Sequence, residues 1–334
     1  MGFEVVADRL SEVYVHRMEN MLRKILVTPR SLTIAGHPSL ERLRKAGYEL
    51  VFSSPGVQPD EQELMRLLPG CVGMLAGIEL ITARVLRAAD SLRVISRNGV
   101  GISNIDVEAA RRLGIRILVA AGANTEGVAE LVFGLALSMV RSIPFSNASL
   151  KGRRWERQMG CELEGKVLGL IGCGRIGKRV AGIALAFGMR VLAFDPVPDQ
   201  MFARSEMFEY VPLERLLRTA DLISLHCPPQ ADGKPLIDRN RIQIMKKGVY
   251  LINTARAELV NEDDILEGLD ASQIAGFATD VFAPEPPSNW RLATHPKVVC
   301  TPHIGAFTRE SIDRAVDMAV NNLLSALGSM HGGT

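Results

Sequence analysis

A glycine-rich hexad in the middle of the chain constrains the fold more than any other feature. It reads Gly172-Cys173-Gly174-Arg175-Ile176-Gly177 and lies between an apolar run over residues 167–171 and a helix-like segment over residues 178–181. Glycines at this spacing let a strand turn tightly into a helix whose free N–H groups meet a phosphate. The hexad therefore predicts a dinucleotide-binding site built from a strand, a turn and a helix.

Asp195 strengthens this prediction and indicates which dinucleotide binds. It ends the next β-rich run, 18 positions after Gly177. A carboxylate there accepts hydrogen bonds from the ribose hydroxyls of NAD and repels the 2′-phosphate of NADP, so we expect NAD as the cofactor. The rest of the cofactor site is expected at later strand ends, from Cys227, Pro228, Thr254, Ala255, Asp280 and Gly305.

Short β-rich runs alternate with helical patterns in two series along the chain. The first series covers residues 25–27, 50–52, 72–75, 94–96 and 115–119, and the second covers 167–171, 191–194, 222–225, 249–252, 274–278 and 298–300. Such alternation is typical of parallel sheets with crossover helices. We therefore predict an α/β protein with two doubly wound parallel sheets.

The segments around the second series indicate how the two domains are connected. Residues 126–139 carry apolar side chains at helical spacing after the turn-forming stretch 121–124, where we place the first hinge. Residues 308–327 form a second amphipathic helix that could pack back on the first domain. We expect a substrate domain at 21–122 and 302–334, a nucleotide domain at 123–301, and an N-terminal extension at 1–20, with Met21 as an alternative start.

Length and composition exclude several classes of protein. The 334 residues are long enough for two cores, and a formal charge of +2 gives no electrostatic reason to expect nucleic acid. No stretch reaches the ~20 apolar residues needed to cross a bilayer, and the acidic start is no signal peptide. The five cysteines are scattered without zinc or redox spacing. We expect a cytoplasmic protein with no metal site, no membrane anchor and a small-molecule ligand.

Three side chains that follow the hexad in order indicate hydride-transfer chemistry. They are Arg256 in Asn253-Thr254-Ala255-Arg256, Glu285 in the segment 280–286, and His303 in Thr301-Pro302-His303-Ile304-Gly305. Taken singly, each also suits an ordinary structural role: a solvated surface charge, a loop residue and a helix-capping or core histidine. His226 and His295 lack this context, and we assign neither a catalytic role.

With these motifs together, the chain resembles the D-isomer-specific 2-hydroxyacid dehydrogenases, the family of phosphoglycerate dehydrogenase, hydroxypyruvate reductase and D-lactate dehydrogenase. The likeness covers roughly residues 23–327 and includes the further motif Arg97-Asn98-Gly99-Val100-Gly101. The resemblance implies a Rossmann nucleotide-binding domain inserted in a flavodoxin-like substrate domain. It also implies an NAD-dependent oxidoreductase that interconverts a D-2-hydroxy acid and its 2-oxo acid.

The resemblance also implies roles for individual residues. Arg256 would hold the carboxylate and carbonyl oxygen of the 2-oxo acid, and His303 would give a proton to the carbonyl oxygen as hydride arrives. Glu285 would fix the tautomer of His303 and favour its imidazolium. The substrate carboxylate would also meet loop residues, namely Ala76, Gly77, Asn98 and Gly99. The segment around Trp155 would contact a neighbouring subunit, so a homodimer is expected.

Three departures from the family pattern leave the substrate and the activity open. Ala257 replaces the glycine that usually follows the arginine, and Gly233 stands where a cofactor-contacting threonine is common. Ala76 stands where phosphoglycerate enzymes place a phosphate-binding arginine, so we expect small unphosphorylated 2-oxo acids as substrates. The alternatives are a phosphoglycerate dehydrogenase proper and a non-enzymatic NAD-sensing scaffold of the corepressor type.

Overall fold

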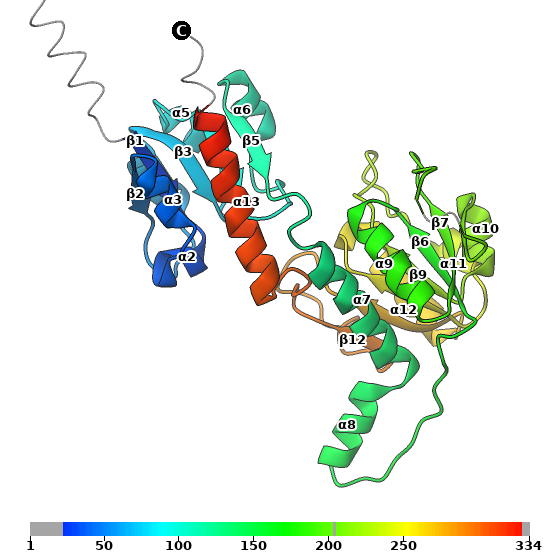
Figure 1. Ribbon diagram of the computed structural model, residues 1–334. Coiled ribbons are helices and arrows are strands. Elements are labelled where there is room, and N and C mark those ends of the chain that lie inside the picture. The colour runs from blue at the N-terminus through cyan, green and yellow to red at the C-terminus, as the bar shows by residue number, and fades with distance from the viewer. Residues whose placement is uncertain (1–22, 203–204, 329–334) are drawn as a thin grey trace, which may run out of the picture. The chain divides into compact units, whose positions relative to one another are not determined.

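The computed structural model describes residues 23–202 and 205–328, so the expected extension at 1–20 lies outside the described residues. The chain divides into two compact units (Figure 1). Among the described residues, unit 1 comprises 23–123 and 312–328, and unit 2 comprises 124–202 and 205–311. Each unit is built around its own parallel sheet, which confirms the predicted α/β class with two doubly wound sheets.

The sheet of unit 1 has five parallel strands in the order β2-β1-β3-β4-β5. This is the flavodoxin-like order, and its topological switch point lies between β1 and β3. Each of the five predicted runs corresponds to one of these strands. They are β1 (Arg23–Val27), β2 (Tyr48–Phe52), β3 (Cys71–Ala76), β4 (Val94–Arg97) and β5 (Arg116–Val119).

Helices cover both faces of this sheet. One face carries α4 (Glu61–Leu67), α5 (Ala83–Ala88) and α6 (Val107–Arg112), and the other carries α2 (Arg30–Ala35), α3 (Leu40–Lys45) and α13 (Arg309–Gly328), as Figure 1 shows. A Cβ on Gly73 of β3 would lie 3.1 Å from Leu323 of α13, so the missing side chain lets the helix pack closely. The last helix thus packs on the sheet of unit 1.

The sheet of unit 2 has seven parallel strands in the order β12-β11-β10-β9-β6-β7-β8, which places its switch point between β6 and β9. The sequence pattern missed β8, a three-residue edge strand whose central Glu209 pairs with Arg190 and Arg215 instead of being apolar. The strands are β6 (Val167–Ile171), β7 (Arg190–Phe194), β8 (Phe208–Tyr210), β9 (Leu222–Leu225), β10 (Val249–Asn253), β11 (Ile274–Thr279) and β12 (Val298–Cys300).

The helices of unit 2 form two layers. The first layer contains α7 (Thr125–Val140) and α9 (Arg175–Ala186), and the second contains α10 (Leu213–Thr219), α11 (Arg239–Ile244) and α12 (Glu262–Asp270). A further helix, α8 (Ile143–Lys151), leads into residues 152–162, and together they stand out from the unit as an arm (Figure 1). Of the helices described, none alone could span a bilayer, although α7 and α8, bent by 63° at their junction, pass that test together.

Residues 302–311 cluster with unit 2, although the sequence pattern had suggested the substrate domain for them. The reason is a set of contacts that only the folded structure shows. The buried carboxylate of Asp280, directly after β11, accepts hydrogen bonds from the backbone N–H groups of Ile304 and Gly305, both at 2.8 Å. A Cβ on Gly127 of α7 would lie 2.8 Å from the Gly305 carbonyl, so this loop is also held against α7.

Candidate active site

The glycine hexad forms the expected turn between β6 and α9. Gly172 has φ +92°, a conformation that L side chains rarely adopt, and a Cβ there would lie 2.5 Å from the His226 carbonyl oxygen. A Cβ on Gly177 would lie 2.3 Å from the Gly172 carbonyl oxygen, so helix and strand could not approach as they do. Both positions therefore require glycine for the turn to exist.

The first turn of α9 offers an open anion site. Gly174 caps this helix of 12 residues, and no described atom lies within 4 Å of the place where its Cβ would stand. The next two residues are the exposed Arg175 and the half-buried Ile176. Free N–H groups and the positive end of the helix dipole therefore face open space, as a pyrophosphate requires.

Asp195 lies at the end of β7 and is already tied to the glycine turn. One carboxylate oxygen accepts from the Cys173 N–H at 2.7 Å, and the other accepts from the Val197 N–H at 2.9 Å. These bonds fix the side chain next to the turn and leave further lone pairs for ribose hydroxyls. The position fits the predicted selection of NAD.

The ends of β9 and β10 supply the other cofactor candidates at the same sheet edge. Cys227 and Pro228 follow β9, and burial raises the pKa of the Cys227 thiol to about 11, so it is a neutral wall of the site and not a nucleophile. Thr254 and Ala255 follow β10. The hydroxyl oxygen of Thr254 is buried and has no hydrogen-bond partner among the described residues, as expected of a group that awaits a ligand.

Strand register brings the predicted catalytic residues to one edge of the sheet. Asn253 of β10 pairs with Thr279 of β11, which in turn pairs with Cys300 of β12. Arg256 and His303 each lie three residues beyond these aligned strand ends, and Glu285 follows β11. Parallel strands that end together therefore deliver all three loops to the edge that also carries the glycine turn.

Glu285 and His303 form a direct pair. Nδ1 of His303 lies 2.8 Å and 2.9 Å from the two carboxylate oxygens of Glu285. Because a carboxylate can only accept, Nδ1 carries a proton and Nε2 is left to face a ligand. His303 also has φ +53°, a left-handed conformation that is rare for a residue with a Cβ and often accompanies functional sites.

Arg256 is placed by its own loop. Its Nη1 donates to the Ala255 carbonyl at 2.6 Å, and its own carbonyl accepts from the buried amide of Asn253 at 2.8 Å. The side chain is exposed, and within the described part of the chain no hydrogen bond joins it to Glu285 or His303. One terminal nitrogen of the guanidinium is thus held by the Arg256 loop, and the exposed side chain has further N–H groups to offer an anion.

Asp280 supports the histidine loop. It accepts from the Thr301 hydroxyl at 2.6 Å as well as from the Ile304 and Gly305 N–H groups, so its bonds lie on both sides of His303 in the chain. A Cβ on Gly305 would lie 3.1 Å from the same carboxylate. Sequence reasoning assigned Asp280 and Gly305 to the cofactor; in the structure they bond to each other, and Asp280 also bonds to Thr301 and Ile304.

The two histidines that were given no catalytic role lie in different surroundings. Burial lowers the pKa of His226 to about 4, and its Nε2 lies 2.8 Å from the Ser224 hydroxyl, so it is a neutral imidazole at pH 7. His295 lies 3.3 Å from Asp270, at the far end of α12. Neither histidine is paired with a carboxylate at the carboxyl edge of the sheet, as His303 is with Glu285.

The substrate-loop candidates of unit 1 follow β3 and β4. Ala76 and Arg97 end these strands and are in register with each other. The N–H groups of Gly77, Asn98 and Gly99 already donate within unit 1, to Glu79, Ala76 and Arg97 respectively. Val100 and Gly101, which the sequence reasoning named within a family motif but not as site residues, have backbone N–H groups without a hydrogen bond in the described structure. These two N–H groups are available as donors near this strand end.

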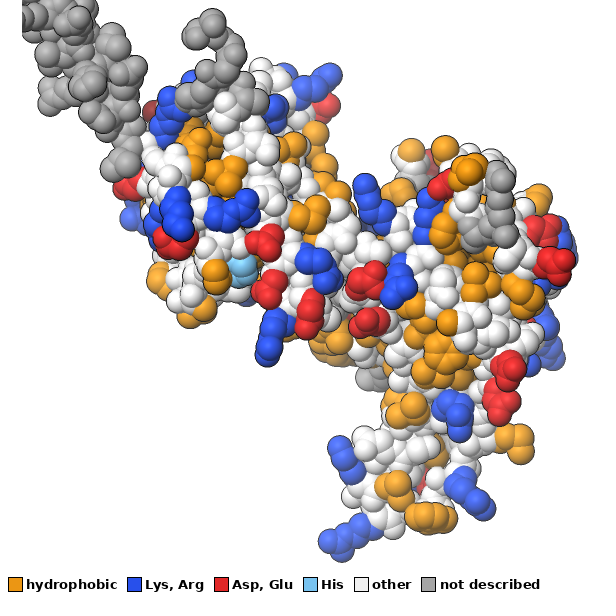
Figure 2. Space-filling model, in the orientation of Figure 1, with side chains coloured by type: hydrophobic (Ala, Val, Ile, Leu, Met, Phe, Trp, Pro, Cys, Tyr) orange, Lys and Arg blue, Asp and Glu red, His pale blue; other side chains and the backbone are white. Residues whose placement is uncertain are grey.

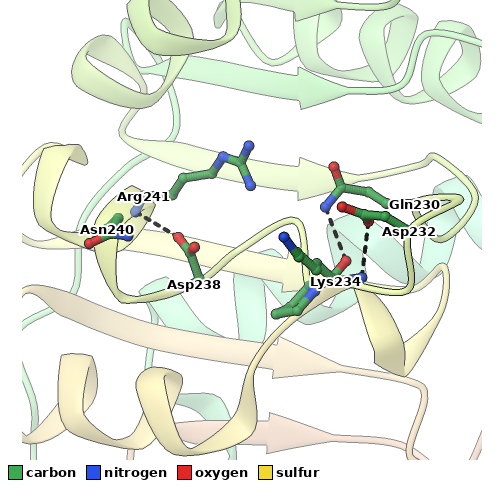
Figure 3. Close-up of a pocket in the computed structure, with 7 residues that line it drawn as sticks. Gln230, Asp232, Lys234, Asp238, Asn240 and Arg241 are labelled. Carbon is green, nitrogen blue, oxygen red and sulfur yellow. Dashed lines mark hydrogen bonds between the residues drawn. The ribbon is translucent and has the colours of Figure 1, made fainter.

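A cavity of about 400 Å³ lies beside the loop that follows β9, and Figure 3 shows the side chains around it. Two acids and two bases line it, and none belongs to the triplet; they are Asp232, Lys234, Asp238 and Arg241. Gly233 in this loop has φ +72° and donates to the Gln230 carbonyl, which explains why glycine stands at this position. Within the described residues, no cluster of His, Cys, Asp or Glu could hold a metal ion.

Comparison with known proteins places this geometry in a family. Residues 133–305 match the NAD-binding domain of the D-isomer specific 2-hydroxyacid dehydrogenases. A hydroxypyruvate reductase from Thermotoga maritima is 38% identical over 84% of this chain and 92% of its own length. A D-3-phosphoglycerate dehydrogenase from Sus scrofa is 39% identical over 76% of this chain, which spans about half of that relative (48%). The crystal structure of a protein from Thermus thermophilus matches with a TM-score of 0.82 and 36% identity, covering 92% of this chain and 97% of that one.

Proposed function

Because the chain belongs to the D-isomer-specific 2-hydroxyacid dehydrogenases and carries their NAD-binding domain, we propose that it interconverts a D-2-hydroxy acid and its 2-oxo acid. The observation that carries the proposal is the His303–Glu285 pair at the sheet edge that also presents the glycine turn and Asp195. This edge unites an anion-binding helix, a paired imidazole and an exposed guanidinium. Those are the groups that reduction of a carbonyl beside a carboxylate requires.

In this proposal each side chain acts on a different atom of the substrate. Bound NADH supplies the hydride that reduces the carbonyl carbon. Arg256 binds the carboxylate and carbonyl oxygen through its planar fork, and Nε2 of His303 gives a proton to that oxygen. Glu285 holds Nδ1 and stabilises the imidazolium before transfer. In the oxidative direction His303 takes the proton back.

We propose the same set of cofactor and substrate contacts that the sequence suggested. The glycine turn, Asp195, the β9 and β10 ends and the Asp280–Gly305 loop would hold NAD. The loops after β3 and β4, with Ala76, Gly77, Asn98 and Gly99, would approach the substrate, and the free N–H groups of Val100 and Gly101 add donors suited to a carboxylate.

A 3-phosphoglycerate dehydrogenase is the second candidate, because relatives with that name are among those matched. Ala76 argues against it, since this buried methyl group cannot bind a phosphate. We therefore propose small unphosphorylated 2-oxo acids such as glyoxylate or hydroxypyruvate as substrates.

The arm formed by α8 and residues 152–162 supports a homodimer. It exposes large apolar side chains that a solitary chain would leave in water, and Figure 2 shows hydrophobic and basic groups together on it. These are Ile143, Phe145, Leu150, Trp155 and Met159. We also propose the cytoplasm as the compartment, because all five cysteines are free thiols, as reducing conditions favour.

The test is the oxidation of NADH, followed by its absorbance, with a panel of 2-oxo acids. The expected result is turnover of at least one acid by the wild-type chain and strong loss in His303→Ala. A protein that binds NADH but turns over no acid in either direction would support the non-enzymatic scaffold instead.

A further inference from the structure

A buried carboxylate lies at the switch point of the unit 1 sheet. In the order β2-β1-β3-β4-β5 the loops after β1 and β3 diverge, and ligands of such sheets bind where they do. Thr28 follows β1, and Gly77 and Glu79 follow β3. The side chain of Glu79 is bonded to Thr28 and to Gly77, and it is only 1% exposed.

Glu79 fills a cradle of hydrogen-bond donors. Its Oε1 accepts from the Gly77 N–H at 2.9 Å and from the Thr28 hydroxyl, which also accepts from the Gly77 N–H at 3.1 Å. A Cβ on Gly77 would lie 2.7 Å from Glu79 Oε2 and 3.2 Å from Pro29 Cα, so only glycine leaves room for the carboxylate. A backbone N–H and a hydroxyl at a switch point are the donors an external anion would use, and the protein's own carboxylate occupies them.

The residues beside Glu79 invert the usual surface pattern. Ile78 is 55% exposed and Leu80 63% exposed, while the charged residue between them is buried. Asn104 fixes this arrangement by donating to the Glu79 carbonyl at 2.6 Å. Charged side chains are rarely buried while their apolar neighbours are exposed, so this reversal indicates a functional site.

Arg97, the last residue of β4, is a second buried charge in unit 1. It is 8% exposed, its Nη1 donates to the Asn98 carbonyl at 2.5 Å, and its Nε has no partner among the described residues. Burial lowers the pKa of Arg97, and the nearby charge of Glu79 opposes that shift. The guanidinium packs against Gly99. Arg97 itself is in register with Ala76 across the β3–β4 pair. Without Glu79, the Gly77 N–H would keep the Thr28 hydroxyl as its acceptor and that hydroxyl would keep the Leu75 carbonyl, and the negative charge that faces these donors would be gone.

We propose that Glu79 is a specificity-determining residue, whose carboxylate occupies the Thr28–Gly77 cradle and excludes substrates that carry a second anionic group. The inference rests on the proposed function, because it concerns the far end of the same 2-oxo acid. The acids accepted are those whose distal group is uncharged, and Ile78 and Leu80 offer that group apolar contacts. A distal phosphate or second carboxylate would be repelled by the negative charge of Glu79.

The test removes the carboxylate and measures whether an anion takes its place. Glu79→Ala, in the full chain with saturating NADH to fill the pyrophosphate site, should bind inorganic phosphate about tenfold more tightly than the wild type or more. Binding is read from the phosphate dependence of the unfolding temperature, with chloride at equal ionic strength as reference. In steady-state assays kcat/KM for 3-phosphohydroxypyruvate, relative to hydroxypyruvate, should rise by a similar factor.

Two control variants test whether a gain in phosphate binding comes from the vacated position of the Glu79 carboxylate or from a general change in charge or loop packing. Glu108→Ala removes an exposed carboxylate of unit 1 and should leave phosphate binding unchanged. Thr28→Val loosens the cradle but keeps the carboxylate, so it should not gain phosphate binding. A gain in Thr28→Val equal to that in Glu79→Ala would show that a loosened loop is the cause and would overturn the proposal.

Phosphate binding that is no tighter in Glu79→Ala than in the wild type would also overturn it. Should Glu79→Ala fail to fold, Glu79→Gln decides, because it keeps the size of the side chain and removes its charge, so kcat/KM for 3-phosphohydroxypyruvate relative to hydroxypyruvate should rise roughly three- to tenfold. An unchanged ratio would contradict the assignment. A chain that turns over no 2-oxo acid would defeat the proposed function, while the phosphate measurements would still report on Glu79.

Discussion

Nδ1 of His303 lies within 2.9 Å of both carboxylate oxygens of Glu285, although the two residues are 18 positions apart in the chain. Both side chains are about half exposed, at 50% and 40%, so the pair can exchange protons with solvent. The carboxylate fixes Nδ1 as the protonated nitrogen, and Nε2 is therefore the atom that can transfer a proton to a ligand.

Replacing the imidazole tests this role most directly. His303→Ala should lower kcat by ~10²-fold or more, because positioned acid–base groups contribute that much, while the Kd for NADH stays close to the wild-type value. Stopped-flow turnover and NADH fluorescence titration measure the two quantities. His295→Ala, which alters a histidine paired with Asp270, is the matched control and should turn over normally. Near-normal turnover in His303→Ala would contradict the assignment.

Glu285→Gln should lower the rate of the reductive reaction. The carboxylate accepts from Nδ1 of His303 at 2.8 Å, and an amide can keep a hydrogen bond there but carries no charge. We therefore expect kcat with hydroxypyruvate to fall roughly three- to tenfold, while the Kd for NADH stays close to the wild-type value. Steady-state rates and NADH fluorescence titration measure the two quantities, and an unchanged kcat would show that the charge of Glu285 has no such role.

Much of this site follows from local sequence patterns, because its elements are continuous in the chain. The glycine turn, the strand before it and Asp195 after the next strand obey spacing rules that hold whatever surrounds them. The carboxyl edge of a parallel sheet then gathers the loops of Arg256, Glu285 and His303. The long amphipathic α13 was equally visible from its periodicity.

Other features depend on contacts that sequence spacing does not encode. The bond between Glu79 and Thr28 joins residues 51 positions apart, and nothing in Ile78-Glu79-Leu80 predicts that the charge turns inward. The strand β8 is short and lies at an edge, where its charged Glu209 is satisfied by neighbouring arginines. Residues 302–311 join unit 2 through the carboxylate of Asp280, a contact fixed only when β11 and β12 align.

Arg256→Lys should weaken both binding and turnover. Nη1 of Arg256 donates to the Ala255 carbonyl and the Arg256 carbonyl accepts from Asn253, so the planar guanidinium is fixed in place with further N–H groups for two oxygens of the substrate. Lysine offers a point charge, so we expect kcat/KM to fall roughly ten- to a hundredfold, with KM raised and kcat lowered together. Steady-state kinetics separate these parameters. A change in KM alone would make Arg256 a binding residue without a role in the transition state.

Asp195 should give the enzyme a preference for NADH over NADPH. Its carboxylate is anchored to the Cys173 and Val197 N–H groups, so it cannot easily move away from a 2′-phosphate. Asp195→Ser removes the charge and should reduce the discrimination roughly tenfold or more, since charge-assisted bonds to the ribose are lost. The ratio of kcat/KM for the two cofactors measures it. Equal use of NADH and NADPH by the wild type would contradict this role.

His226 should make the fold sensitive to mild acid. Its pKa is about 4 in the folded chain and near 6.5 when unfolded, so between these values the unfolded state binds more protons. Stability should therefore fall as the pH drops from 6.5 towards 4, with a slope of at most about 1.4 kcal/mol per pH unit from this group. Urea unfolding at pH 7 and pH 5 measures the loss. In His226→Asn the difference between the two pH values should shrink, and an unchanged difference would assign the acid sensitivity to other groups.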